Sequence, residues 1–193
     1  MDTEHQHEPK SLDAGDLRLA ILAAAKAYDS KSFVIVGRAS LAASLPDCDP
    51  SLRSTMDVDL FPPWNEGKTA VWAAADITIG RVSAFRKEHG FYVERVAEWT
   101  TKLLPPGWDG RMVRFVIDDI DVGALHPMDL VCAKLQAGRH KDLLFVRSAI
   151  ESGVTSKEAV HAFVQEHVHD EAHRSFLVER LGAAMTAAEE NEE

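Results

Sequence analysis

Two aspartates, Asp57 and Asp59, stand two residues apart inside an apolar run, and this spacing limits the folds open to the chain. The run 55–61 predicts a β-strand that ends before Pro62. Residues i and i+2 of a strand point to the same face, so both carboxylates lie on one face while Val58 points into the core. We therefore expect a sheet with one buried apolar face and two negative charges on the opposite face.

Two neighbouring carboxylates on a sheet face repel each other unless a positive charge lies between them. A pair of divalent ions is a common solution, and such ions bind phosphates for in-line displacement reactions. The alternative is a pair of solvent-facing aspartates on an edge strand, where charge prevents aggregation. The spacing of Asp57 and Asp59 alone leaves both interpretations open.

A glycine turn upstream of the aspartates supports the metal interpretation. The sequence predicts a buried strand over 33–36, then Gly37, then a short helix over 39–45. Backbone N–H groups at a helix N-terminus bind phosphate well, so this turn is a place to hold a triphosphate. Arg38 could add a charge-assisted contact to phosphate, and Ser40 a hydroxyl. The alternative is an ordinary strand-to-helix turn.

The rest of the chain predicts an α+β fold with a mixed sheet and a helical C-terminal part. A first helix over 13–28 has Asp13 as its N-cap, with Asp16 three residues later. The further elements that we predict are a helix over 68–76, a strand over 91–96, a loop over 104–110, a hairpin of strands over 111–117 and 120–125, a helix from 127 that Gly138 interrupts, a second helix over 139–150, and a last helix from a capping box at 155–158 to 188.

The length of 193 residues suits one domain. We expect a single domain over 13–188, with a sheet core over 13–126 and a helical part over 127–188. The polar N-terminus 1–12 and the acidic tail 189–193 are expected to be disordered.

Composition narrows the class of protein further. A net charge of −10 argues against a protein that coats DNA or a membrane surface, although a local basic patch could still bind nucleic acid. No apolar run reaches the ~18 residues that a spanning helix needs, and Cys48 and Cys132 have neither a CxxC nor a metal-ligand spacing. We therefore expect a soluble, cytoplasmic protein that does not bind membranes.

A second charged segment, 129–142, begins on a predicted apolar helix. Lys134 stands among apolar residues there, and such a lysine is costly unless it reaches solvent or has an anionic partner. Arg139 and Lys141 could bind phosphates, and Asp142 could orient one of these basic groups or act as a base. The alternative is a set of surface charges in which Asp142 pairs with a lysine inside or between helices.

Together these segments resemble the nucleotidyltransferase superfamily, in particular a bacterial family of nucleotidyltransferase-like proteins related to AbiEii-type toxins. The superfamily pattern is a strand, a glycine turn, a short helix, and Asp-x-Asp on the next strand, and here it falls on 34–41 and 53–60. The lysine helix and the Arg-x-Lys-Asp stretch of the family correspond to Lys134 and 139–142.

The resemblance implies a minimal palm-like mixed sheet flanked by helices, an NTP as donor, and Mg²⁺ or Mn²⁺ as cofactor. Carried onto this sequence, it assigns metal binding to Asp57 and Asp59, phosphate contacts to Gly37 and Ser40, and completion of the active site to Lys134 and Asp142. Related toxins transfer a nucleotide to an RNA such as tRNA, or a phosphoryl group to a protein. The resemblance therefore also implies an RNA, protein or small-molecule acceptor and, in a toxin–antitoxin system, an antitoxin partner.

Two departures from the family pattern leave a second function open. Arg38 stands where the family has glycine or serine, and its side chain could contact phosphate or block it. Active members often have a third carboxylate on a neighbouring strand; alternation makes Asp121 the best candidate for this metal ligand, and Asp119 competes with it. Without a third carboxylate, the chain would be a catalytically degenerate member that binds nucleotide or a partner protein.

Overall fold

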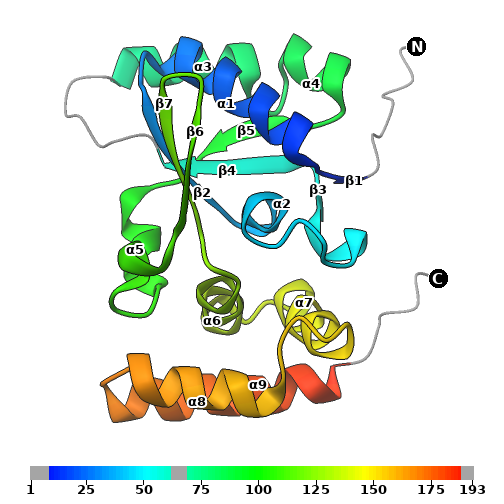
Figure 1. Cartoon of the computed structure of the whole chain (residues 1–193), viewed down its shortest axis with the longest axis vertical. Coiled ribbons are helices and arrows are strands. Elements are labelled where there is room, and N and C mark those ends of the chain that lie inside the picture. The colour runs from blue at the N-terminus through cyan, green and yellow to red at the C-terminus, as the bar shows by residue number, and fades with distance from the viewer. Residues whose placement is uncertain (1–8, 62–68, 188–193) are drawn as a thin grey trace. The chain divides into compact units, whose positions relative to one another are not determined.

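The computed structural model describes residues 9–61 and 69–187 of the chain (Figure 1). Two compact units divide the chain: a sheet unit of residues 1–98 and 113–125, and a helical unit of residues 99–112 and 126–193. Residues 99–112, which the sequence places in the sheet core, thus group with the C-terminal helices. Residues 1–12 and 189–193 were predicted to be disordered. Of these, residues 1–8 and 189–193 lie outside the described ranges.

The sheet unit alternates strands with helices and short 3-10 turns. Its described elements are β1 (Lys10–Ser11), α1 (Ala14–Tyr28), β2 (Ser32–Val36), η1 (Arg38–Ser40), α2 (Leu41–Ser44), η2 (Pro50–Arg53), β3 (Ser54–Thr55), β4 (Asp57–Phe61), α3 (Thr69–Ile79), α4 (Ala84–His89), β5 (Tyr92–Arg95), β6 (Val113–Ile117) and β7 (Ile120–Ala124). Asp13 caps α1 as predicted, in a reciprocal capping box with Asp16. Helix α4 was not predicted, and the strand predicted over 55–61 is divided at Met56.

Five strands form a mixed sheet in the order β5-β4-β2-β7-β6. Strand β2 pairs antiparallel with β4 and parallel with β7. Strand β4 pairs parallel with β5, and β6 and β7 form the predicted antiparallel hairpin. This topology confirms the α+β class with a mixed sheet.

Helices α1 and α3 lie along one face of the sheet (Figure 1), and that face is apolar. Val58 and Leu60 of β4 are both 0% exposed and pack in this core. Burying a side chain of this size contributes roughly 1.5–3 kcal/mol to folding. Asp57 and Asp59 alternate with them and are partly exposed, so β4 has one apolar and one charged face, as its sequence predicts.

Part of the N-terminal segment that was expected to be disordered is ordered. Strand β1 pairs antiparallel with β3, with Lys10 opposite Thr55. Leu12 is 0% exposed, and the Arg53 guanidinium donates a hydrogen bond of 2.7 Å to its carbonyl oxygen. The buried Leu12 and its hydrogen bond with Arg53 therefore anchor the polar N-terminal segment against β3.

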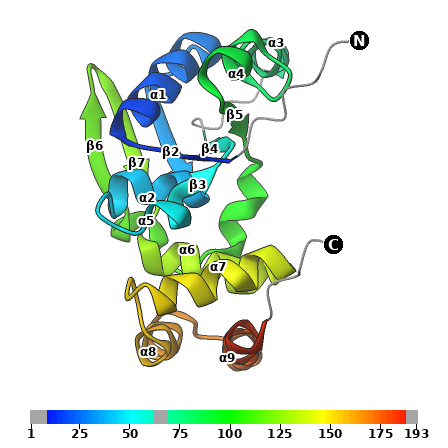
Figure 2. The ribbon, with the colours of Figure 1, turned by 90° about the vertical axis from the view of Figure 1, so that its right-hand side faces the viewer.

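The helical unit contains two pairs of helices that pack on each other. Its described elements are η3 (Glu98–Leu103), α5 (Trp108–Arg111), α6 (Pro127–Ala137), α7 (His140–Glu151), α8 (Lys157–His167) and α9 (Glu171–Thr186). Figure 2 shows α8 and α9 end-on and side by side, beneath α6 and α7. Gly138 separates α6 from α7 as predicted, in the left-handed conformation that favours glycine at a helix end.

The prediction of one last helix from 155 to 188 is wrong. The chain leaves α8 after His167, and α9 begins with Asp170 as its N-cap, whose carboxylate accepts a 2.7 Å bond from the N–H of His173. The first cap is also shifted by one residue, because Ser156 rather than Thr155 accepts from the N–H of Ala159. The break therefore falls on the polar run 169–171, where Asp170 caps the new helix.

The loop predicted over 104–110 is partly helical, since α5 begins inside it. None of the helices in the described part of the chain is long and apolar enough to cross a membrane.

Candidate functional site

Three carboxylates meet on the charged face of the sheet unit. Asp57 and Asp59 project from β4, and Glu94 projects from the neighbouring strand β5. One oxygen atom of each lies within 4.8 Å of the others. Among the described residues this is the only group of three acidic, histidine or cysteine side chains close enough to share a metal ion.

The register of the parallel strands explains why Glu94 joins the pair. Asp57 lies opposite Tyr92, and Asp59 lies opposite Glu94. Opposite residues of paired strands point to the same face. Glu94 was not among the predicted site residues, although its strand was predicted.

The structure brings neither of the two predicted third carboxylates to the pair. Asp59 lies opposite Val36 and Asp121 opposite Ser32, at the two ends of the same strand β2. Four strand residues span about 13 Å at a rise of roughly 3.3 Å per residue. Asp119 instead forms an exposed ion pair with Lys31.

The donor set fits a hard divalent cation. Mg²⁺ and Mn²⁺ prefer carboxylate and water oxygens, and they are bound by few protein ligands when a phosphate completes the shell. Asp57 and Asp59 are partly exposed, and Glu94 is exposed. The three carboxylates are therefore open to water and to substrate oxygens.

Gly37 lies directly against the Asp59 carboxylate. Its backbone has φ 63° and ψ −165°, a region that side chains other than hydrogen strongly disfavour. A Cβ atom at this position would lie 3.3 Å from Cγ of Asp59 and closer still to Oδ2. Both the backbone conformation and the space therefore require glycine, and the predicted turn adjoins the predicted metal ligand.

Two other residues of the turn make contacts inside the protein. Ser40 is 0% exposed, and its hydroxyl donates a 2.8 Å bond to the Gly37 carbonyl. A serine hydroxyl has one proton, so this bond uses the donor that was predicted to contact phosphate. Nη1 of Arg38 lies 3.4 Å from the Ser54 carbonyl oxygen. Ser40 therefore shapes the turn, and Arg38 reaches toward β3.

Hydrogen bonds and burial also define the surroundings of Asp57. The hydroxyl of Thr55 donates to Oδ1 of Asp57. Tyr92 is 6% exposed, and burial raises its pKa above the usual 10.0, with further increases from the negative charges of Asp57 and Glu94. The phenol is therefore protonated at neutral pH and is unsuited to act as a base.

Lys134, Arg139 and Asp142 form an ionic cluster in the helical unit. Asp142 is 1% exposed and accepts bonds of 2.9 Å from Nζ of Lys134 and 2.5 Å from Nε of Arg139. Burial raises the pKa of Asp142, but the hydrogen bonds and charges of Arg139 and Lys134 outweigh it, so the pKa lies below its ordinary value. Lys134 thus has the anionic partner that its apolar surroundings require, in a pair between α6 and α7.

Two further charged residues of the helical unit bear on the predicted site. Lys141, predicted to bind nucleotide, is exposed on α7.

Arg111 was not predicted to be important. It holds the fully buried Asp129 through two bonds of 2.6 and 2.9 Å and donates to the carbonyls of Pro105 and Pro106. This ion pair attaches the proline loop to α6.

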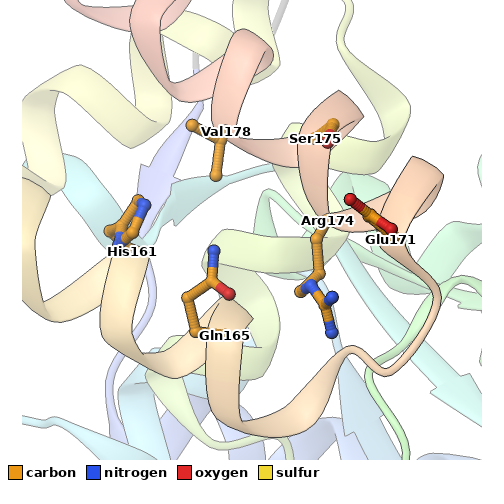
Figure 3. Close-up of a pocket in the computed structure, with 6 residues that line it drawn as sticks. All are labelled: His161, Gln165, Glu171, Arg174, Ser175 and Val178. Atoms are coloured by element: carbon orange, nitrogen blue, oxygen red, sulfur yellow. The ribbon is translucent and has the colours of Figure 1, made fainter.

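A surface hollow of about 240 Å³ lies between α8 and α9 (Figure 3). It is lined by His161, Gln165, Glu171, Arg174, Ser175 and Val178. Arg174 donates bonds of 3.1 and 3.2 Å to the carbonyls of Val168 and His169. Its guanidinium therefore stabilises the break between the two helices.

The α+β fold with its five-stranded mixed sheet is compatible with a nucleotidyltransferase-like protein. Residues 16–186 match the family described as "nucleotidyltransferase of unknown function (DUF6036)", and the chain belongs to that family. No curated protein matches the chain, and no solved structure matches it.

Proposed function

We propose that this protein is a divalent-metal-dependent nucleotidyltransferase, which transfers a nucleotide from an NTP to an acceptor and releases pyrophosphate. The observation that carries the proposal is the convergence of Asp57, Asp59 and Glu94 on one face of the sheet, beside the turn at Gly37. Family membership supports the reaction class. The geometry supports metal dependence, because three clustered carboxylates repel one another without a cation.

Asp57, Asp59 and Glu94 would hold the metal, which when bound neutralises phosphate charge and activates an acceptor oxygen for in-line displacement. Gly37 has no side chain, so its backbone leaves room for a triphosphate next to Asp59. The resemblance further assigns a stabilising positive charge to Lys134, whose Nζ donates a 2.9 Å bond to the Asp142 carboxylate.

The competing proposal is a degenerate member of the family that binds nucleotide without transferring it. Its sequence basis was the missing third carboxylate and the arginine at position 38. Glu94 supplies a third carboxylate, and the Arg38 guanidinium reaches the carbonyl of Ser54. Both observations favour the enzyme.

The test is a labelling assay on the full chain. The protein is incubated with Mg²⁺, each of the four NTPs labelled in turn at the α-phosphate, and a mixture of total RNA and cell protein. Asp57→Asn is the control, because it keeps the size of the side chain and removes its charge. We expect label in one fraction with one NTP, and none with the variant.

Two other outcomes would contradict the proposal. In a parallel assay with NTPs labelled at the γ-phosphate, label that is transferred from the γ-phosphate alone would indicate phosphoryl transfer instead. No label at all, together with stabilisation by Mg²⁺-NTP, would indicate the degenerate binding protein. A ligand at 100 times its Kd adds about 2.7 kcal/mol to the free energy of unfolding, so that binding is easily detected.

A further inference from the structure

We infer that Thr55 is a positioning residue for the Asp57 carboxylate, and that the N-terminal strand β1 holds Thr55 in place. This inference rests on the metal site of the proposed function. Thr55 contacts no substrate in this account; it acts only through Asp57.

The hydroxyl of Thr55 makes two contacts with the same residue. It donates its proton to Oδ1 of Asp57, and its oxygen lies 3.4 Å from the backbone N–H of Asp57, from which it accepts. The first contact fixes the rotation of the carboxylate, and the second fixes the backbone where β4 begins. A carboxylate has about four lone-pair sites on its two oxygens, so Oδ2 and part of Oδ1 stay available to a cation.

Thr55 is itself held in place by the pairing of its short strand β3 with β1. Lys10 of β1 lies opposite Thr55, and Ser11 lies opposite Ser54. Next to this pairing, the N–H of Leu12 donates a 3.3 Å bond to the carbonyl of Arg53. The Arg53 guanidinium returns a 2.7 Å bond to the carbonyl of Leu12. Because Leu12 is 0% exposed, these contacts attach β3 to the core, and the β-branched Thr55 has few rotamers left.

Residues that orient a metal ligand by hydrogen bonding contribute to the affinity of the site for the metal. Their loss typically weakens binding about 10- to 100-fold. We therefore expect Thr55→Val, which keeps the shape and removes the hydroxyl, to raise the Kd for Mn²⁺ by about 10-fold or more. Thr55→Ser keeps the hydroxyl and is expected to bind Mn²⁺ as the wild type does.

The experiment is a Mn²⁺ titration of the full chain, followed by the EPR signal of free Mn²⁺. Ser54→Ala is the matched control, since it removes a hydroxyl from the same strand without touching Asp57. Asp57→Asn reports the metal site itself. Thermal unfolding checks that each variant is folded, and Thr55→Ala replaces Thr55→Val if the latter does not fold.

The outcomes separate the inference from the proposed function. Thr55→Val binding as tightly as the wild type, or Thr55→Ser binding as weakly as Thr55→Val, would overturn the role of the hydroxyl and leave the metal site standing. A wild type that binds no Mn²⁺ beyond what Asp57→Asn binds would overturn the metal site and, with it, this inference. As a second readout, raising Mg²⁺ should restore labelling by Thr55→Val, which a purely structural defect would not allow.

Discussion

Gly37 and Asp59 show how closely single residues of the site depend on each other. The turn brings the backbone of Gly37 against the Asp59 carboxylate in a conformation that only glycine adopts without strain. The sequence shows a glycine after a strand, which is common at any strand-to-helix turn. The contact with Asp59 comes from the antiparallel pairing of β2 with β4, in which Val36 lies opposite Asp59.

Gly37→Ala should therefore damage both stability and metal binding. The backbone strain alone costs of order 1–3 kcal/mol, and the new methyl group displaces the Asp59 carboxylate. We expect a lower free energy of unfolding in denaturant and weaker Mn²⁺ binding. Gly153→Ala is the control, because Gly153 has φ 76° with nothing within 4 Å of a Cβ. It should lose stability but keep Mn²⁺ affinity; equal Mn²⁺ affinity in both variants would refute the role given to Gly37.

Glu94→Gln should have the opposite effect on stability. Asp57, Asp59 and Glu94 repel one another in the absence of a cation, so removing the exposed charge of Glu94 is expected to leave stability unchanged or to raise it by about 0.2–1 kcal/mol. The same variant should lose the stabilisation that Mg²⁺-NTP gives the wild type. Thermal unfolding with and without Mg²⁺-NTP measures both effects. A marked loss of stability without ligand would mean that Glu94 has a structural role.

At the level of elements, the pair α6 and α7 depends on the buried Asp142. Asp142→Asn removes the carboxylate charge that Lys134 and Arg139 share. Side chains of these residues are 17% and 61% exposed, so water compensates part of the loss. We expect a cost of about 1.5–3 kcal/mol in denaturant unfolding, the usual range for hydrogen bonds to charged groups. Glu151→Gln, in the exposed Arg147–Glu151 pair of the same helix, is the control and should cost less than about 0.5 kcal/mol.

The same cluster should make stability sensitive to acid. The pKa of Asp142 is lower in the folded protein than its ordinary value of 3.8. The stabilisation that ionised Asp142 gives the folded protein is therefore complete above the ordinary pKa. It is lost as the pH falls through the lower folded pKa, since the unfolded chain binds the proton first. Unfolding free energies measured from pH 5 downward should fall less steeply for Asp142→Asn than for the wild type. Parallel curves would show that Asp142 is not ionised in the cluster.

The elements also show where sequence reasoning succeeds. Strong period-two and period-3.6 patterns with caps predicted β2, β4, the β6–β7 hairpin, α1 and the α6–α7 break. The exceptions have local physical causes. Asp170 starts a new helix in the polar stretch 169–171, and Leu12 anchors a polar segment. Neither effect changes the periodicity from which elements are predicted.

The third carboxylate could not be identified from strand patterns alone, because these patterns do not say which strands are neighbours in the sheet. Asp121 and Glu94 both lie on predicted strands, and the sheet order β5-β4-β2-β7-β6 places Glu94 on the strand next to Asp57 and Asp59. A usable signal was present in the sequence. When helices connect two consecutive strands, the second strand tends to lie parallel to the first and next to it. This tendency favours β5 as the neighbour of β4. Applying that rule would have favoured Glu94.

At the scale of the whole molecule, the family match over residues 16–186 runs through both the sheet unit and the helical unit. The helices after residue 126 are therefore part of the family architecture and not an unrelated appendage. The ionic cluster of Lys134, Arg139 and Asp142 belongs to that shared part.

A role as a toxin, which the resemblance to AbiEii-type proteins implies, gives a prediction for living cells. Induced expression of the wild type in a bacterial host should arrest growth, because uncontrolled nucleotide transfer would inactivate an essential acceptor. Asp57→Ala should relieve the arrest, whereas Asp121→Ala, outside the carboxylate group, should not. Growth curves with immunoblots for equal protein levels measure this. Normal growth with the wild type would remove the basis for the toxin role.

The central claim is that Asp57, Asp59 and Glu94 form one metal-dependent nucleotidyl-transfer site. The most direct test compares initial labelling rates with the α-labelled NTP for the wild type, Glu94→Gln and Asp121→Asn at equal Mg²⁺. We expect Glu94→Gln to lose about 10-fold or more of the rate, because loss of even a residue that orients a metal ligand typically costs about 10- to 100-fold, while Asp121→Asn keeps the wild-type rate. A Glu94→Gln variant as fast as the wild type, or an inactive Asp121→Asn variant, would contradict this claim.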